Sequence, residues 1–265
     1  MTLIVTLIST PPPAPSHKGR GRLVPFHPAA FIARLEGRAW GAAPAMANCR
    51  PHRHRNRPAA NAGAGTPPMS DAPLVTDPFA RFREWYAEAD AQEPDANAMT
   101  VATATADGRP SARAILLKGI DDRGFVFFTN KQSRKSGELA ANPHVALLFH
   151  WKSLARQVRI EGPAESTTDA EADAYYASRP RISRLGAWAS DQSRPLDSRL
   201  TLEQRLAEYE AKYPGEDIPR PPHWSGYRVL PESFEFWQNM PFRLHDRTLY
   251  TRRPDGGWTI GKLFP

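Results

Sequence analysis

The sequence predicts a mainly β protein of the α+β class, an antiparallel barrel-like sheet with flanking helices, in residues 69–265. Seven or eight short segments of that region have the apolar runs or alternation typical of strands. Tight-turn signals such as Asp107-Gly108, rather than helices, join most of them. The sequence has no GxGxxG or Walker loop, so a doubly wound parallel sheet that binds a dinucleotide or nucleoside triphosphate loses its main support.

The first half of this region begins with a helix in "DPFARFREWYAEADAQ". Asp77 is its expected N-cap, Pro78 its first residue, and apolar residues recur on one face. Three strands follow within residues 99–130. A short helix capped by Ser133 is expected to end near Asn142.

The second half adds two helices and the remaining strands. In "TTDAEADAYYASRP", Thr168 and Glu171 match a capping box and Pro180 is expected to end the helix. Another helix is expected in residues 196–215. The remaining strands are expected within residues 144–153, 155–167, 223–238, 242–253 and 257–265.

The positive charge of the chain lies in its first 68 residues. The formal net charge of the whole sequence is +7, which at first suggests nucleic-acid binding. Residues 1–68 contain nine Lys and Arg but one acid, a net charge of +8. The remainder has 26 basic and 27 acidic residues, a net charge of −1. We therefore expect no general affinity of residues 69–265 for nucleic acid.

Residues 1–68 are rich in Pro, Ala, Gly and Arg and show no sustained helical or strand period. Such a segment cannot bury enough apolar surface to offset its ordering entropy, so we expect a disordered basic leader. Its Arg-rich, acid-poor composition also fits an organelle transit peptide. A simpler interpretation is a translation start at Met69. Cys49, His52 and His54 match no strong zinc spacing, so no metal is expected.

The sequence favours a cytoplasmic setting. Cys49 is the only cysteine, which excludes an internal disulfide framework. No segment reaches the length of a transmembrane helix, and the apolar opening "MTLIVTLIST" lacks the positive region of a signal peptide. We therefore expect no membrane attachment.

One group of cations and hydroxyls surrounds the start of the short helix at residue 133. Thr129, Ser133, Arg134 and Lys135 cluster there, where free backbone N–H groups and the helix dipole favour an anion. Cations at a helix start oppose the dipole unless an anion bridges them, and a phosphate resolves that conflict. The nearby stretch "RAILLK" carries Arg113 and Lys118 at its ends. Taken alone, it is more typical of an ordinary strand whose charged ends reach water, and the neighbouring cluster shifts that balance.

A second cationic group lies in "YYASRPRIS". Tyr175 and Arg179 are four residues apart on one helical face, and Ser183 follows Pro180. Their hydroxyls and guanidinium also suit a phosphate. A solvated helix end explains the same residues.

Polar side chains on the later strands form a third group. As a strand, "RLHDR" places Arg243, His245 and Arg247 on one face. "ARQVRIEG" places Gln157, Arg159 and Glu161 on one face, and that face could simply meet water. Gln192 and Ser193 in "ASDQS" could form hydrogen bonds with a heteroaromatic ring. A Trp such as the one in "FEFWQ" is amphipathic but more often core.

Together these segments resemble the pyridoxine/pyridoxamine 5′-phosphate oxidase family. The matching stretches are, in order, "RPSARAILLKG", "FVFFTNKQSRKSGELAANP", "ALLFHWKSLARQVRIEG", "YYASRPR", "LGAWASDQS", "PPHWSGYRV", "FEFWQ" and "RLHDR". The resemblance covers about residues 75–265, and so many motifs in one order are highly specific. It implies an FMN-binding split β-barrel that works as a homodimer with FMN at the subunit interface.

The resemblance also implies the site residues. FMN would be held by Arg113, Ala114, Ile115, Leu116, Leu117, Lys118, Phe128, Thr129, Arg134, Lys135, Gln157, Gln192, Ser193, Trp237 and Arg247. The substrate would meet Lys118, Tyr175, Arg179, Ser183, Arg243, Leu244 and His245, with Arg243 and His245 in the catalytic roles.

The implied reaction is the oxidation of pyridoxamine or pyridoxine 5′-phosphate to pyridoxal 5′-phosphate in vitamin B6 metabolism. A hydride would pass from C4′ to flavin N5, and O2 would become H2O2, with ammonia released from the amine. Two alternatives stay open: a split-barrel flavoprotein with another substrate, and a protein that binds FMN or pyridoxal phosphate without turnover.

The sequence departs from the family pattern at four residues that adjoin these motifs. Ile182 and Arg184 flank Ser183, and Asn239 and Met240 precede the "RLHDR" stretch. The first pair concerns the substrate phosphate site and leaves the flavin residues largely untouched. Preference between the two substrates, and any general base, do not follow from the sequence.

Overall fold

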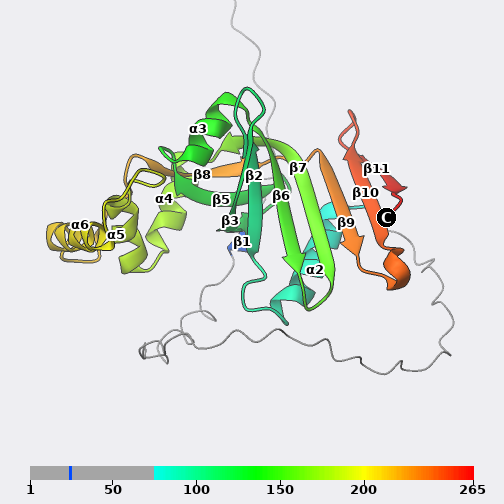
Figure 1. Ribbon diagram of the computed structural model, residues 1–265, viewed down its shortest axis with the longest axis horizontal. Coiled ribbons are helices and arrows are strands. Elements are labelled where there is room, and N and C mark those ends of the chain that lie inside the picture. Colours follow the sequence, from blue (N-terminus) through cyan, green and yellow to red (C-terminus); the bar gives the residue numbers. More distant parts are fainter. Residues whose placement is uncertain (1–23, 26–74) are drawn as a thin grey trace, which may run out of the picture.

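The computed structural model describes residues 24–25 and 75–265, which form a curled antiparallel sheet with helices against it (Figure 1). The strands are β1 (Val24–Pro25), β2 (Ala98–Ala104), β3 (Pro110–Leu116), β4 (Gly119–Ile120), β5 (Phe125–Asn130), β6 (His144–Trp151), β7 (Arg156–Ser166), β8 (Trp224–Val229), β9 (Ser233–Gln238), β10 (Asp246–Arg252) and β11 (Trp258–Lys262). The helices are α2 (Pro78–Asp90), α3 (Arg134–Ala141), α4 (Asp169–Ala177), α5 (Arg181–Ala189) and α6 (Arg199–Lys212), with a 3-10 turn at Pro241–Arg243. The expected leader, its transit-peptide alternative, the Met69 start and the cysteine–histidine group lie outside the described residues, β1 apart.

The sheet divides at β7, and this division gives the molecule its curl. Its main path runs β1-β4-β5-β8-β7-β6-β2-β3, and all described strand pairs are antiparallel. The first part of β7 pairs with β9, as in Gln157↔Trp237, while its end pairs with β8, as in Glu165↔Arg228. β9, β10 and β11 therefore form a separate branch of the sheet.

The core lies between α2 and the concave side of the sheet. Asp77 caps α2 as expected, since its carboxylate accepts hydrogen bonds from the N–H groups of Phe79 (3.0 Å) and Ala80 (3.3 Å). The apolar face then buries Phe82, whose ring centroid lies 4.8 Å from that of Phe125 in an edge-to-face contact. Burial of these aromatic rings fixes α2 against β5 and its neighbours.

Most of the sequence-derived elements are confirmed. The predicted fold class is correct, and the strand runs correspond to β2 through β11 with small shifts at their ends. The capping box of α4 is present: the Thr168 hydroxyl accepts from Glu171 N (3.2 Å), and the Glu171 carboxylate accepts from Thr168 N (2.8 Å). Ser133 is the N-cap residue of α3, but its hydroxyl donates to Ser136 Oγ (3.2 Å) and makes no cap bond.

The prediction that Pro180 ends a helix is wrong. α4 already ends at Ala177, and Pro180 is the N-cap residue of α5, a helix that the sequence reading missed. A proline is as well suited to starting a helix as to ending one, because its missing N–H is not needed in the first turn. Arg179 consequently lies just past α4, not on its helical face beside Tyr175.

The strand reading of "RLHDR" is also wrong. β10 begins only at Asp246, and the residues before it form a 3-10 turn in which Phe242 and Arg243 have φ angles of 57° and 64°. Pro241 has no backbone N–H to donate to a neighbouring strand. The N–H of Met240 donates to His245 Nδ1 (3.3 Å), and this hydrogen bond closes the turn. Arg243 and His245 therefore do not share a strand face with Arg247.

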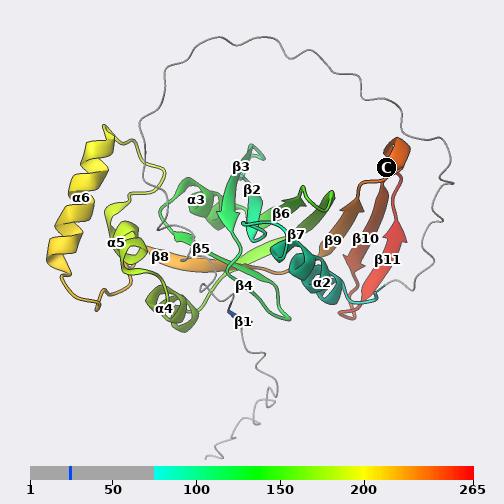
Figure 2. The ribbon, with the colours of Figure 1, turned by 90° about the horizontal axis from the view of Figure 1, so that it is seen from below.

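The helices and the branch sheet lie at opposite ends of the molecule. Figures 1 and 2 both place α3 to α6 at one end and β9 to β11 at the other, with β2, β3, β6 and β7 between them. No helix of the described part of the chain is long and apolar enough to cross a membrane. Within residues 75–265, no three His, Cys, Asp or Glu side chains are grouped as a metal site.

Candidate functional site

Lys135 is the buried centre of a cationic cradle formed by Arg113, Arg134 and Lys135 around the start of α3. Its Nζ donates to Thr129 Oγ1 (2.9 Å), Ser133 Oγ (3.3 Å) and Gln192 Oε1 (2.5 Å). Burial, followed by the charge of Arg113, lowers the pKa of Lys135 to about 8. The ammonium is still largely protonated at neutral pH, but no carboxylate pairs with it among the ion pairs of residues 75–265.

A buried carboxylate that the sequence analysis missed, Glu138, orients the two arginines of the cradle. Its Oε1 accepts from Arg134 Nε (2.8 Å), and its Oε2 accepts from Ser111 Oγ (2.7 Å) and pairs with Arg113 (3.3 Å). Burial alone would raise the pKa of Glu138, but hydrogen bonds from Ser111, Thr103 and Arg134 lower it to about 2. The position of Glu138 four residues after Arg134 on a helix was the available sequence signal.

The cradle borders an open hollow of about 430 Å³. It is lined by Ser111, Ala112, Arg113, Ala114, Ile115, Arg134, Lys135, Gln192 and Ser193. Seven of these nine residues were predicted to bind FMN from the sequence. Three cations against the single Glu138 carboxylate leave two positive charges, which matches the roughly two negative charges of a phosphate monoester at pH 7. The residues present therefore fit the phosphate end of a group such as FMN.

Not every residue of the predicted 113–118 segment faces this hollow. Leu117 is fully buried in the core, so its side chain cannot contact a ligand in the hollow. Leu116 is 40% exposed but does not line it. β3 is the end strand of the main sheet path and pairs only with β2, which leaves its outer edge open.

A second cluster combines Lys118, Arg179 and a stack of aromatic rings. The Phe128 ring contacts those of Tyr175 (centroids 4.2 Å apart) and Trp224 (5.3 Å), and Tyr175 and Trp224 also contact each other (6.1 Å), all nearly parallel. Arg179 lies over the Trp224 ring, 5.0 Å from its centroid. The charge of Arg179 affects both Tyr175 and Lys118, so the three groups belong to one cluster.

The second cluster carries unneutralised positive charge. Burial, followed by the nearby Arg179, lowers the pKa of Lys118. One Arg179 nitrogen, Nη1, is buried without a hydrogen-bond partner, and no described carboxylate pairs with either cation. A buried donor of this kind is costly unless a ligand satisfies it. The described chain therefore has two separate clusters whose charge suits an anionic group.

Residues near Ser183 account for two of the four departures from the family pattern. Ser183 lies in the first turn of α5, where its N–H donates to Pro180 O (2.9 Å). Ile182 is 56% exposed, and Arg184 is tied to Glu216 (2.6 Å) by an ion pair. Arg184 is therefore engaged outside the second cluster.

A third group lies on the branch sheet. Trp237 is paired in register with Gln157 on one side and Arg247 on the other, and its ring centroid lies 4.7 Å from that of His245. Arg247 donates through Nε to Glu235 (2.7 Å) and through Nη1 to the carbonyl of Phe264 (2.8 Å). The Glu235 carboxylate raises the pKa of Arg247.

The residues just before β10 are exposed. Arg243 and Leu244 both face solvent, with Leu244 67% exposed. Asn239 and Met240 enter this turn through backbone bonds, Asn239 N to Ala155 O (2.9 Å) and Met240 N to His245 Nδ1.

Within one chain the third group does not meet the other two. No hydrogen bond, ion pair or ring contact of the described residues joins it to the cradle or the second cluster, and Figures 1 and 2 place α3, which carries two cradle residues, away from β9 and β10. The residues that the sequence grouped as one site are therefore brought together as two adjacent clusters and one distant group.

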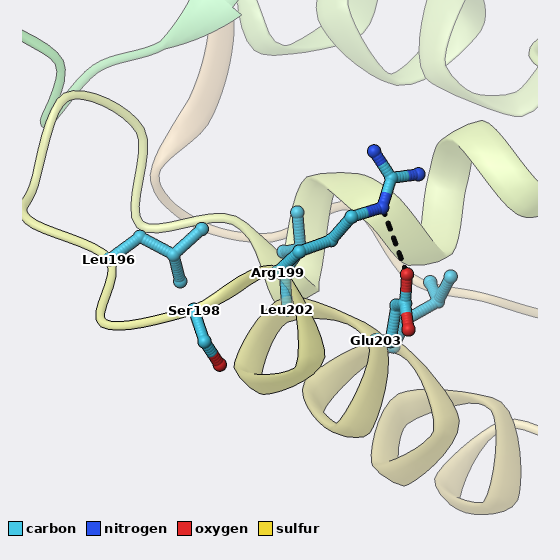
Figure 3. A pocket seen from close by; sticks show the side chains of 6 residues that line it. Leu196, Ser198, Arg199, Leu202 and Glu203 are labelled. Carbon is cyan, nitrogen blue, oxygen red and sulfur yellow. Dashed lines mark hydrogen bonds and ion pairs between the residues drawn. The ribbon is translucent and has the colours of Figure 1, made fainter. Parts of the chain in front are cut away.

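A further hollow of about 480 Å³ lies beside α6 (Figure 3). It is lined by Leu196, Ser198, Arg199, Leu202, Glu203 and Leu206, and Arg199 Nε donates to Glu203 Oε1 (3.0 Å). Its single cation is already neutralised, so it lacks the donors that an anionic ligand requires.

Comparison with protein families matches nearly all of the described fold. A model described as pyridoxamine 5′-phosphate oxidase matches residues 86–213. A second model, described as pyridoxine 5′-phosphate oxidase C-terminal dimerisation region, matches residues 224–265. The first contains the cradle and the second cluster, and the second contains most of the third group.

Individual relatives agree with these matches. The chain is 64% identical over 202 residues to the pyridoxine/pyridoxamine 5′-phosphate oxidase of Gluconobacter oxydans, covering 74% of this chain and 100% of the relative. It is 62% identical over 200 residues to the enzyme of the same name from Sphingopyxis alaskensis, covering 75% and 92%.

Solved structures with the same fold include PhzG from Burkholderia lata in complex with tetrahydrophenazine-1-carboxylic acid. It is 36% identical, with a TM-score of 0.69, and the match covers 74% of this chain and 95% of that one. A pyridoxamine 5′-phosphate oxidase-related FMN-binding protein from Nostoc punctiforme, 17% identical with a TM-score of 0.59, covers 72% and 100% and supports the fold alone.

Proposed function

Because this chain belongs to the pyridoxamine 5′-phosphate oxidase family, we infer that it oxidises pyridoxamine or pyridoxine 5′-phosphate to pyridoxal 5′-phosphate, with FMN as cofactor and O2 as final acceptor. The observation that carries this function is the presence of two separate clusters that each keep an excess of positive charge. One phosphate belongs to the cofactor and one to the substrate. A protein that bound a single phosphorylated ligand would need only one of them.

The cradle is the proposed site of the FMN phosphate. Arg113, Arg134 and Lys135 would neutralise it, and Thr129 and Gln192 would add neutral hydrogen bonds beside Lys135. Bound there, FMN supplies the two-electron acceptor for the reaction. The protein contributes the charge and the fixed geometry of the site.

The second cluster is the proposed site of the substrate phosphate. Lys118, Arg179, Tyr175 and Ser183 would bind it, and the buried Arg179 Nη1 would gain the partner that it lacks in the free protein. The cation–π contact with the Trp224 ring stabilises Arg179 in this position. Binding the non-reacting phosphate in this way positions C4′ for oxidation.

The third group would complete the site from a second copy of the chain. The family model for residues 224–265 describes a dimerisation region, which supports a homodimer. We propose that Trp237, His245 and Arg247 of one protomer cover FMN bound to the cradle of the other. The open edge of β3 and the exposed turn before β10 are the surfaces available for this contact.

Arg243 and His245 would face the reacting part of the substrate. Two successive non-glycine residues with positive φ, Phe242 and Arg243, cost about 1–3 kcal/mol each, and such strain is typical of functional turns. His245 Nδ1 accepts from Met240 N, so a neutral His245 carries its proton on Nε2. It would therefore present a donor to the substrate, while Arg243 steers the reacting group.

One alternative function has a specific observation in its favour. The Burkholderia lata structure contains tetrahydrophenazine-1-carboxylic acid, so a protein of this fold can hold a ligand without a phosphate. The second cluster argues against that here, because two cations and an orphan donor suit a phosphate. Aerobic addition of pyridoxine 5′-phosphate should yield pyridoxal 5′-phosphate and an equal amount of H2O2. A flavin-containing protein that forms neither product would favour the alternative.

We further propose that residues 69–265 are the complete catalytic unit and that the enzyme is cytoplasmic. The two family models lie entirely within these residues, and residues 1–68 supply none of the proposed ligands. A binder without turnover, the remaining possibility from the sequence, would keep its flavin oxidised when substrate is added without oxygen.

A further inference from the structure

Arg228 is the most deeply buried charged side chain described, and none of the proposed ligand contacts uses it. It lies on β8 and is 1% exposed. Its Nη1 pairs closely with Asp121 Oδ2, its Nη2 with Glu171 Oε1 (2.5 Å), and its Nε lies 4.0 Å from Glu165. Burying such a network costs desolvation free energy, and fold stability alone is a weak reason to keep it.

Each of the two main carboxylates divides its oxygens between a local turn and Arg228. Asp121 Oδ1 accepts from Arg123 N and Gly124 N (both 3.0 Å), which shapes the turn between β4 and β5. Glu171 Oε2 accepts from the N–H of Thr168 (2.8 Å) and so forms the capping box of α4. In both residues the remaining oxygen binds Arg228, so one guanidinium joins two turns that are 50 residues apart in sequence.

These two turns carry the substrate phosphate cluster. Asp121 follows Lys118 by three residues, and the N–H of Lys118 donates to Val126 O (2.8 Å), across the hairpin that Asp121 closes. Glu171 precedes Tyr175 by one turn of α4, and Arg179 lies two residues past the end of that helix at Ala177. Hydrogen bonds from Thr168, together with the charge and hydrogen bond of Arg228, outweigh the effect of burial and keep the pKa of Glu171 below its usual value.

We propose that Arg228 is a positioning residue for the substrate phosphate: by bridging Asp121 and Glu171, it sets the distance between Lys118 and the Tyr175–Arg179 pair. This inference rests on the proposed function of the second cluster. Arg228 touches neither ligand in this arrangement. Its planar fork binds two carboxylates at once, which a lysine ammonium does in a different geometry.

The test uses Arg228→Lys and Glu171→Gln in the full-length holoenzyme. Glu171→Gln keeps an oxygen for the capping box but removes the charge that binds Arg228. It therefore breaks the same bridge from its other side, and the inference can still be tested if Arg228→Lys folds poorly. The matched control is Arg83→Ala, which removes the exposed ion pair (3.2 Å) between α2 and Asp122, the residue next to Asp121. Thermal midpoint and bound flavin are measured for all of them, followed by kcat and KM with pyridoxine 5′-phosphate and with pyridoxine, which lacks the phosphate.

We expect KM for pyridoxine 5′-phosphate to rise about tenfold in both variants, equivalent to about 1.4 kcal/mol of lost binding. The value of kcat, the bound flavin and kcat/KM for pyridoxine should stay within about twofold of wild type, as in Arg83→Ala. An equal loss of kcat/KM for both substrates, or an unchanged KM for the phosphorylated one, overturns the inference and leaves the proposed function standing. A wild-type holoenzyme that fails to oxidise pyridoxine 5′-phosphate overturns both.

Discussion

The titration of Lys135 should make FMN binding weaken above pH 8. Lys135 is buried in the cradle, and its pKa in the free protein is about 8. A bound phosphate dianion favours the charged ammonium and raises this pKa toward or above its ordinary value of about 10.4. Binding therefore takes up a proton wherever the free protein has lost it.

The magnitude follows from the gap between the two pKa values. Below pH 7 the ammonium is almost fully charged, so the dissociation constant of FMN should rise only about twofold from pH 7 to 8. Above pH 8 it should rise by a factor approaching ten for each pH unit, which gives about a tenfold weaker complex at pH 9 than at pH 7. Below about pH 6 the phosphate itself takes up a proton, and binding weakens again for that separate reason.

Quenching of FMN fluorescence on titration with apoprotein measures this dissociation constant. Lys118 is a second lysine whose pKa burial and Arg179 lower, so a variant is needed to assign the pH dependence. Lys135→Met removes the ammonium and should weaken binding by about 1.5–3 kcal/mol, the usual value of a hydrogen bond to a charged group. It should also abolish most of the change between pH 7 and 9. Equal dissociation constants at pH 7 and 9 in the wild type, or the same pH dependence in Lys135→Met, would refute the reasoning.

Three other predictions concern the groups separately. Arg134→Ala should lower bound flavin far more than turnover per flavin, whereas Arg243→Ala should cut turnover and leave flavin content near wild type; the reverse pattern contradicts the assignments. Glu138→Gln should destabilise the protein by about 3 kcal/mol in urea unfolding, because it leaves Arg113 without its buried partner. The pKa of Glu138 is about 2 in the folded protein. The stability that its charge contributes is therefore fully present above pH 4.5 and is lost as the pH falls through 2. Deleting residues 1–68 should change neither flavin content nor turnover, and a large loss of either would place a needed element in that segment.

The parts of the fold that the sequence predicts well are those set by local signals. The N-cap of α2 and the capping box of α4 depend on side chains within three residues of the bonds that they make. The strands are predictable because buried apolar and exposed polar side chains alternate along them, as with the buried Val158 and Ile160 of β7. The part of the cradle at the start of α3 was predictable for the same reason, because Thr129, Arg134 and Lys135 lie close together in the chain, whereas Arg113 comes from β3.

The features that were missed depend on contacts distant in sequence. Glu138 and Arg228 look like ordinary charged residues of a helix and a strand until folding buries them among partners up to 107 residues away. The prediction of a strand in "RLHDR" was wrong because the alternation of side chains does not reveal the turn that Pro241 and the His245 side chain impose. Whether two groups of residues at opposite ends of one chain form one site depends on a second chain, which a single sequence does not describe.

The most direct test of the central claim, that one active site is built from two protomers, is co-expression of two defective variants. Lys135→Met damages the cradle and Arg243→Ala damages the branch-sheet side, so each homodimer should be nearly inactive. If the site is shared, each heterodimer regains one intact site, and random pairing restores about a quarter of wild-type sites. Activity of differently tagged, purified heterodimers near half that of wild type is the predicted result. Heterodimers no more active than the two parents would show that each site lies within a single chain and would contradict the claim.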